Sequence, residues 1–105
     1  MYDIKERLLK FHEKSKDVNK HWGDLMPMMA MEEAGELAQA ISKLERYEQS
    51  GQYDRLDDIE HYDKKEAVIK ESADVIIAIA ALGDRYGYDI GDIELAIKRK
   101  LERQY

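Results

Sequence analysis

Four carboxylates stand out in the sequence because they form two pairs, each with its members three residues apart. Glu33 and Glu36 form the first pair, and Glu71 and Asp74 form the second. Residues at i and i+3 project from the same side of a helix, so each pair would place two negative charges together. Like charges this close repel, and one of them stays protonated unless a cation joins them. The spacing therefore predicts a cation site.

The ligand type indicates which cation to expect. Two antiparallel helices could bring the two pairs together as a cage of four carboxylates. A ligand set made only of oxygen suits Mg²⁺ or Mn²⁺ rather than Zn²⁺. Mg²⁺ in such sites usually keeps several waters and also binds the phosphate oxygens of a substrate. We therefore expect Mg²⁺ as the cofactor, with Mn²⁺ as an alternative, and a ligand that carries phosphate.

The sequence around each carboxylate pair decides how strongly that pair indicates a functional site. Residues 75–82, directly after Asp74, are apolar without interruption, which predicts a central and buried helix segment. A carboxylate at the edge of such a segment needs a partner. Glu33 and Glu36 taken alone would more often be a solvated helix face, and Gly35 between them indicates either a close helix approach or access for a ligand. Both pairs together favour a site.

The elements that position these residues are predicted to be four helices. Apolar side chains recur at intervals of three and four, which is typical of helices. Asp24 and Asp63 are expected N-caps, and Gly87 is the expected C-terminal stop. The expected helices cover 2–15, 24–48, 64–86 and 92–103, with a break over 16–23 and a long acidic loop over 49–62. His61 is expected to be exposed in that loop. No strand is predicted.

Length and composition narrow the class of protein further. The chain has 105 residues, a formal net charge of −6 and no cysteine. One domain over 1–105 is expected. The acidic charge disfavours nucleic acid as a partner, since such binding depends on Lys and Arg neutralising phosphates. The apolar run over 75–82 is too short to cross a membrane, and 1–10 lacks the apolar region of a signal peptide. A cytoplasmic location is expected, which agrees with the absence of cysteine.

The predicted fold class is therefore all-α, a four-helix bundle-like chain whose core is completed by oligomerisation. A chain this short buries a modest fraction of its surface. The apolar surface of the helix over 64–86 also exceeds what three short companion helices can cover. We expect a partner subunit to cover the remainder.

Three segments carry a resemblance to a known family. The stretches "AMEEAGELAQAI", "ESADVIIAIAAL" and "IKRKLERQY" resemble the EExxE…ExxD motif pair and the basic C-terminal end of the MazG-like all-α nucleoside triphosphate pyrophosphohydrolases. The resemblance spans about residues 22 to 105. It implies that Glu33, Glu36, Glu71 and Asp74 are catalytic metal ligands. It also implies that Glu32 is a further catalytic acid, which helps to hold a second metal or orients water.

The resemblance also implies an activity. Members of this family split a nucleoside triphosphate into the monophosphate and pyrophosphate with Mg²⁺, and they work as homodimers or homotetramers. Lys100 and Arg103 match basic residues that bind phosphate, although Gln104 departs from the "K..RR[FY]" pattern. Trp22 matches a position where an aromatic ring stacks on the base, and packing over the end of the bundle is an equally good interpretation.

Two other functions also fit the sequence, and a third is set aside. A pyrophosphohydrolase of the phosphoribosyl-ATP type resembles the same scaffold and differs in its substrate. A catalytically silent helical adaptor or oligomerisation module would keep the acids as surface groups or structural ligands. A di-iron carboxylate bundle needs Glu-x-x-His pairs, and the predicted helices contain none.

Overall fold

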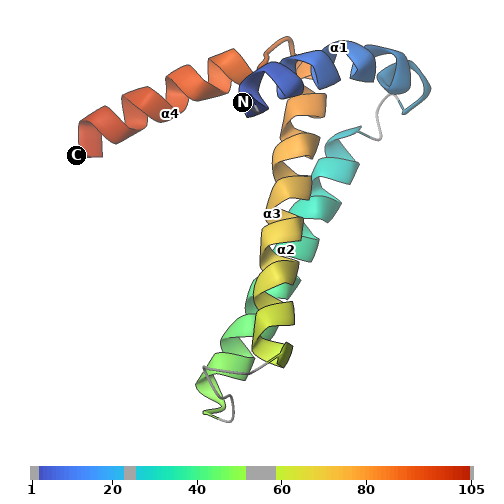
Figure 1. Ribbon diagram of the computed structural model, residues 1–105. Coiled ribbons are helices and arrows are strands. Elements are labelled where there is room, and N and C mark those ends of the chain that lie inside the picture. The colour runs from blue at the N-terminus through green and yellow to red at the C-terminus, as the bar shows by residue number, and fades with distance from the viewer. Residues whose placement is uncertain (1–2, 23–25, 52–58, 105) are drawn as a thin grey trace.

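The computed structural model describes residues 3–22, 26–51 and 59–104. These residues form four helices and no strand, in the order α1 (Ile4–Trp22), α2 (Met26–Gln49), α3 (Ile59–Tyr86) and α4 (Ile90–Gln104) (Figure 1). The predicted all-α class is confirmed. The expected cap at Asp24 lies outside the described residues.

Two helices are longer than the sequence pattern predicted. α1 continues to Trp22, so the predicted break over 16–23 is wrong for 16–22, and Gly23 lies outside the described residues. That segment is polar but has no Gly or Pro before Gly23, and polarity alone does not end a helix. α3 begins at Ile59 rather than 64, so the acidic loop is shorter than expected and Asp63 lies inside the helix instead of capping it.

The junction between α3 and α4 follows from the local sequence. Gly87 has a φ of 75°, and its amide donates to the carbonyl of Gly83 at 2.8 Å. The predicted glycine stop is therefore confirmed, because this left-handed conformation favours glycine. α4 then begins at Ile90 rather than 92. Its cap is Asp89, whose Oδ1 accepts from the amide of Asp92 at 3.2 Å, while Asp92 Oδ2 accepts from the amide of Asp89 at 2.9 Å.

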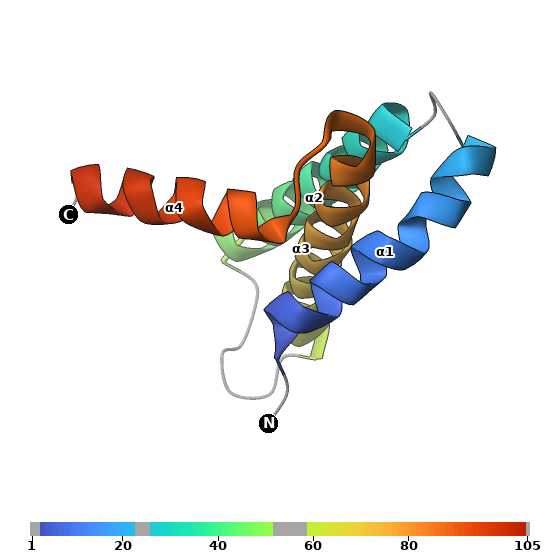
Figure 2. The ribbon, with the colours of Figure 1, turned by 90° about the horizontal axis from the view of Figure 1, so that it is seen from above.

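α3 is the central helix because it packs against both α2 and α1. α2 and α3 run antiparallel as a long hairpin, and α1 crosses α3 near the end that leads to α4 (Figures 1 and 2). At that crossing, His12 Nδ1 donates to the carbonyl oxygen of Ala80 at 3.2 Å. α4 leads away from the hairpin, and an ion pair of 2.9 Å between Lys5 Nζ and Glu94 Oε1 links its first half to α1.

The core of the single chain is thin. Among the described residues the buried apolar side chains are Met26, Ala40, Ala80 and Ala81. The predicted burial of 75–82 is therefore correct for Ala80 and Ala81. It is wrong for Ile76, Ile77 and Ile79, which are 49%, 42% and 37% exposed. The reason is geometric, since α1 and α2 cover only part of the circumference of α3.

The dimensions of the chain agree with this thin core. Its radius of gyration is 17.0 Å, whereas a compact domain of 105 residues would have about 13 Å. Its accessible surface is 8285 Å², against about 6,100 Å² for a compact monomer of this mass. Much of the apolar surface of the isolated chain is therefore uncovered. No helix in the described ranges is both long enough and apolar enough to cross a membrane.

Candidate metal centre

The antiparallel packing of α2 and α3 brings three of the four paired carboxylates together. One carboxylate oxygen each from Glu33 and Glu36 on α2 and from Glu71 on α3 lies within 4.8 Å of the other two. We call these three residues the carboxylate cluster. Their spacing is short enough for a single cation to contact all three.

Two oxygens of the carboxylate cluster lack any partner. Glu33 Oε2 and Glu71 Oε2 are shielded from solvent, and no group in the described part of the chain hydrogen-bonds to them. Shielding a carboxylate oxygen without a partner is unfavourable, and such groups are uncommon in native proteins. A cation at this position would supply the missing interaction, and an all-carboxylate donor set fits a hard cation such as Mg²⁺ or Mn²⁺. The residues present therefore fit the metal that the sequence predicted.

The electrostatics of the cluster agree with its geometry. Burial is the main cause that raises the pKa of Glu33 above its ordinary value of 4.5, followed by the charges of Glu36, Asp74, Glu71 and Glu32. The pKa of Glu71 is raised by burial first, then by the charges of Glu36 and Asp74 and by a hydrogen bond with Glu36. Without a cation the cluster therefore tends to hold protons, which a bound cation would displace.

Asp74 and Glu32 lie at the edge of the cluster. Both side chains are exposed, and neither belongs to the group of three. Asp74 is nevertheless near enough for its charge to raise the pKa of both Glu33 and Glu71, while the charge of Glu32 acts on Glu33 alone. Asp74 is thus near enough to the cluster to be a further ligand, whereas Glu32 is an exposed neighbour of Glu33 on α2.

The surroundings of Gly35 on α2 are open. A Cβ added at Gly35 would meet nothing within 4 Å. Of the two interpretations of this glycine, a close approach of two helices within the chain is therefore wrong. Access for a ligand stays a prediction, and it is not favoured by the position of Gly35, about 130° around α2 from the direction midway between Glu33 and Glu36.

The remaining predicted site residues lie elsewhere. Lys100 and Arg103 occupy the end of α4, which points away from the α2–α3 hairpin (Figures 1 and 2). The single chain therefore does not bring them to the carboxylate cluster, and their role in phosphate binding stays a prediction. Trp22 ends α1, but its side chain lies outside the described part of the chain.

A second polar contact, which the sequence did not predict, joins α2 to α3 near the acidic loop. His61 Nε2 lies 2.8 Å from Glu48 Oε1, and the rings of His61 and Tyr47 stack with centroids 6.2 Å apart. The expectation that His61 is exposed is wrong, because α3 begins before it and turns it toward α2. Only knowledge of this helix start would have revealed the contact.

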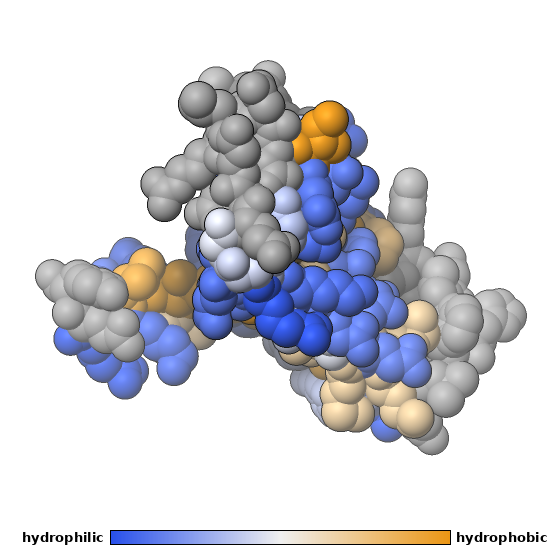
Figure 3. All heavy atoms as spheres, turned by 90° about the horizontal axis from the view of Figure 1, so that it is seen from below, coloured by the Kyte–Doolittle hydropathy of each residue, from blue (hydrophilic) through white to orange (hydrophobic). Residues whose placement is uncertain are grey.

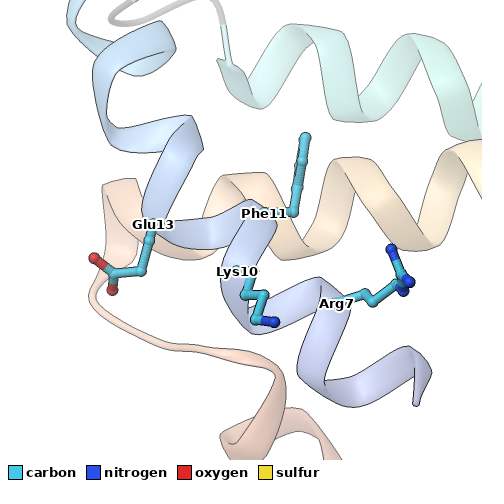
Figure 4. A pocket seen from close by; sticks show the side chains of 4 residues that line it. All are labelled: Arg7, Lys10, Phe11 and Glu13. Atoms are coloured by element: carbon cyan, nitrogen blue, oxygen red, sulfur yellow. The ribbon is translucent and has the colours of Figure 1, made fainter. Parts of the chain in front are cut away.

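Two hollows on the surface do not include the carboxylate cluster. One, of roughly 470 Å³, is lined by Arg7, Lys10, Phe11 and Glu13. The four side chains fan out from α1 in different directions instead of converging on a ligand (Figure 4). The other is an apolar groove of roughly 400 Å³ between α1 and α3, which we call the α1–α3 groove.

The fold and the cluster together define a small all-α protein with a candidate carboxylate metal centre. The chain is 34% identical over 109 aligned positions to the Uncharacterized protein YvdC of Bacillus subtilis (strain 168), an alignment that covers 98% of this chain and 93% of that protein. The chain therefore belongs to the same family as YvdC. No model of a protein family matches it, and no solved structure gives a significant match.

Proposed function

We propose that this protein is a Mg²⁺-dependent nucleoside triphosphate pyrophosphohydrolase of the MazG-like type, which releases pyrophosphate and a nucleoside or deoxynucleoside monophosphate. The observation that carries the proposal is the carboxylate cluster, with its three oxygens within 4.8 Å and its two unpartnered oxygens. The EExxE…ExxD motif pair on α2 and α3 supports it. A cytoplasmic location, where nucleotides are abundant, is part of the same proposal.

In this proposal both α2 and α3 supply ligands to the cation. Glu33 and Glu36 of α2 and Glu71 of α3 would bind it, and Asp74 would complete the set from the next turn of α3. Bound Mg²⁺ would neutralise phosphate charge and lower the pKa of an attacking water.

The reaction balances without a nucleophilic side chain. The oxygen of water bonds to phosphorus, the phosphoanhydride bond between the α and β phosphates breaks, and pyrophosphate leaves. The water gives up a proton in this step. Glu32 is exposed beside the cluster, where it could orient the water and accept that proton.

The phosphate contacts require more than one chain. α4 carries Lys100 and Arg103 away from the carboxylate cluster of their own chain (Figure 1). We therefore include a homodimer or homotetramer in the proposal, in which these basic residues serve the site of another copy. The uncovered apolar surface supports such an assembly.

The test is a set of nucleoside and deoxynucleoside triphosphates, together with phosphoribosyl-ATP, assayed with Mg²⁺ for pyrophosphate release. We expect at least one triphosphate to be cleaved by the wild type. Asp74→Asn and Glu36→Gln should abolish the release. Glu45→Gln on α2, an exposed acid away from the cluster, is the matched control and should keep full activity.

Each other outcome has a defined meaning. Cleavage of phosphoribosyl-ATP alone would favour that type of pyrophosphohydrolase. No pyrophosphate from any substrate would contradict the enzyme and favour the helical adaptor. Full activity in Asp74→Asn and Glu36→Gln would contradict the assignment of the site.

A further inference from the structure

α4 is an amphipathic helix whose apolar side is uncovered in the single chain. Ile93, Ile97 and Leu101 follow one another at intervals of four along this side, and Ile97 and Leu101 are 52% and 51% exposed. Apolar atoms gather on the projecting helix, at the left of Figure 3. A short helix gains most of its stability by packing such a side against another surface. α4 therefore lacks a packing partner over its second half.

The α1–α3 groove is an apolar surface of the matching kind. Ile4, Leu8 and Phe11 of α1 form one wall and Ala73, Ile76 and Ile77 of α3 form the other, with Arg7 at the edge. Ile4 is 63% exposed and Ile76 is 49% exposed, so the walls lack cover. The groove and α4 are thus two uncovered apolar surfaces of one molecule.

The two surfaces agree in length and pattern. Ile93 to Leu101 spans about 12 Å of helix, and Ile4 to Phe11 spans about 10 Å at 1.5 Å per residue. A helix that binds in a groove presents apolar anchors on successive turns of one side, as α4 does with Ile93, Ile97 and Leu101 at intervals of four. The single chain cannot combine them, because the short connection 87–89 and the Lys5–Glu94 pair direct α4 away from the hairpin (Figure 2).

We propose that α4 of one copy packs in the α1–α3 groove of a second copy, and that the second copy returns the same contact. A reciprocal exchange of this kind closes as a two-fold dimer. The accessible surface of the chain exceeds that of a compact monomer by about 2,200 Å². Stable dimers of this class bury on the order of 1,000–2,500 Å² per copy, so the excess is sufficient. The inference rests on the homo-oligomer of the proposed function and not on its catalytic part.

The first test compares the same substitution at two leucines of α4, one on the apolar side and one off it. Light scattering on the full chain should give twice the monomer mass of 12.3 kDa, or a multiple of it. Leu101→Glu should reduce the mass to that of the monomer, or halve it. Leu95→Glu is the matched control and should keep the wild-type mass, because Leu95 is 46% exposed and lies about 120° around the helix from Leu101. A wild-type monomer, or a Leu101→Glu mass equal to the wild type, would overturn the proposal.

The second test identifies the surfaces that meet, and it uses the absence of native cysteine. Copies with Ile77→Cys, mixed with copies carrying Leu101→Cys, should form a disulfide-linked heterodimer under mild oxidation. Leu95→Cys in place of Leu101→Cys should not. The proposal is overturned if no heterodimer forms, or if Ile77→Cys copies link mainly to each other, which would indicate that α3 faces meet directly. These results are independent of pyrophosphate release, so failure here is distinguishable from failure of the proposed function.

Discussion

The middle of the α2–α3 hairpin and the projecting α4 each leave groups without a partner, but the groups are of opposite kinds. Among the residues that the structure describes, the hairpin offers no hydrogen bond to the carboxylate oxygens Glu33 Oε2 and Glu71 Oε2. α4 leaves the apolar side chains of Ile97 and Leu101 in contact with water. The unpartnered carboxylate oxygens need a cation, a proton or another hydrogen-bond donor. The exposed apolar side chains need another apolar surface. The two regions thus indicate two different partners.

The largest expected effect separates the two regions by function. Replacing Glu71 with Gln removes a ligand from the carboxylate cluster and leaves α4 untouched. We expect pyrophosphate release to fall by at least about 100-fold, since even indirect support of a metal ligand is worth 10- to 100-fold. The mass of the assembly should not change. An equal loss in Glu45→Gln would show that removing any acid of the hairpin has this effect. It would contradict the assignment of a specific site to the carboxylate cluster.

Mg²⁺ should stabilise the folded chain through the cluster. Saturation to about 100 times the dissociation constant adds about 2.7 kcal/mol, which corresponds to a rise in the melting temperature on the order of 10 °C. Thermal unfolding with and without Mg²⁺ measures this shift. Glu71→Gln should lose it, and Glu45→Gln should keep it. A shift that persists in Glu71→Gln would place the Mg²⁺ site elsewhere.

Without Mg²⁺, the stability of the hairpin should depend on pH in an unusual direction for acids. The pKa values of Glu33 and Glu71 are raised in the fold above 4.5, so between 4.5 and the raised values the folded chain binds more protons than the unfolded chain. Stability from these groups is therefore present below pH 4.5 and is lost as pH rises through the raised values. Urea unfolding across this range measures the slope, which Glu33→Gln combined with Glu71→Gln should reduce. An unchanged slope in that variant would contradict the assignment.

The smallest expected effect concerns Gly35 on α2. Gly35→Ala should stabilise α2 by about 1 kcal/mol, because glycine in a helix interior is unfavourable and the added Cβ has room. Chemical denaturation measures the gain. Pyrophosphate release should stay near that of the wild type, because Gly35 lies about 130° around α2 from the direction midway between Glu33 and Glu36. A loss of stability instead would show that the assembly covers Gly35.

The sequence predicted the helices well where local chemistry decides them. The intervals of apolar residues gave four helices, and Gly87 gave the end of α3 because its φ of 75° favours glycine. The start of α3 was missed because the acids around Asp63 resemble a loop, although nothing there prevents a helix. The exposure of Ile76 was missed because an apolar run does not reveal which chain covers it.

The same distinction applies to the site. Spacing predicted that two pairs of carboxylates could meet, because helix geometry fixes the side on which each pair projects, and three of the four do so. The choice of Glu33 and Glu36 over Glu32 depended on the resemblance to the MazG-like family. Spacing could not indicate which oxygens lack partners, since that depends on how α2 and α3 are rotated about their axes. Nor could it place Lys100, because the direction of α4 is set by the connection 87–89 and by the Lys5–Glu94 pair.

The central claim, that the carboxylate cluster binds a divalent cation, is tested most directly by titrating Mn²⁺ into the full chain and following the free ion by electron paramagnetic resonance. We expect the free signal to be suppressed to saturation by the wild type and by Glu45→Gln, and to be restored by excess Mg²⁺. Glu71→Gln should not suppress it. A free signal that the wild type leaves unchanged, or that Glu71→Gln suppresses equally, would contradict the claim.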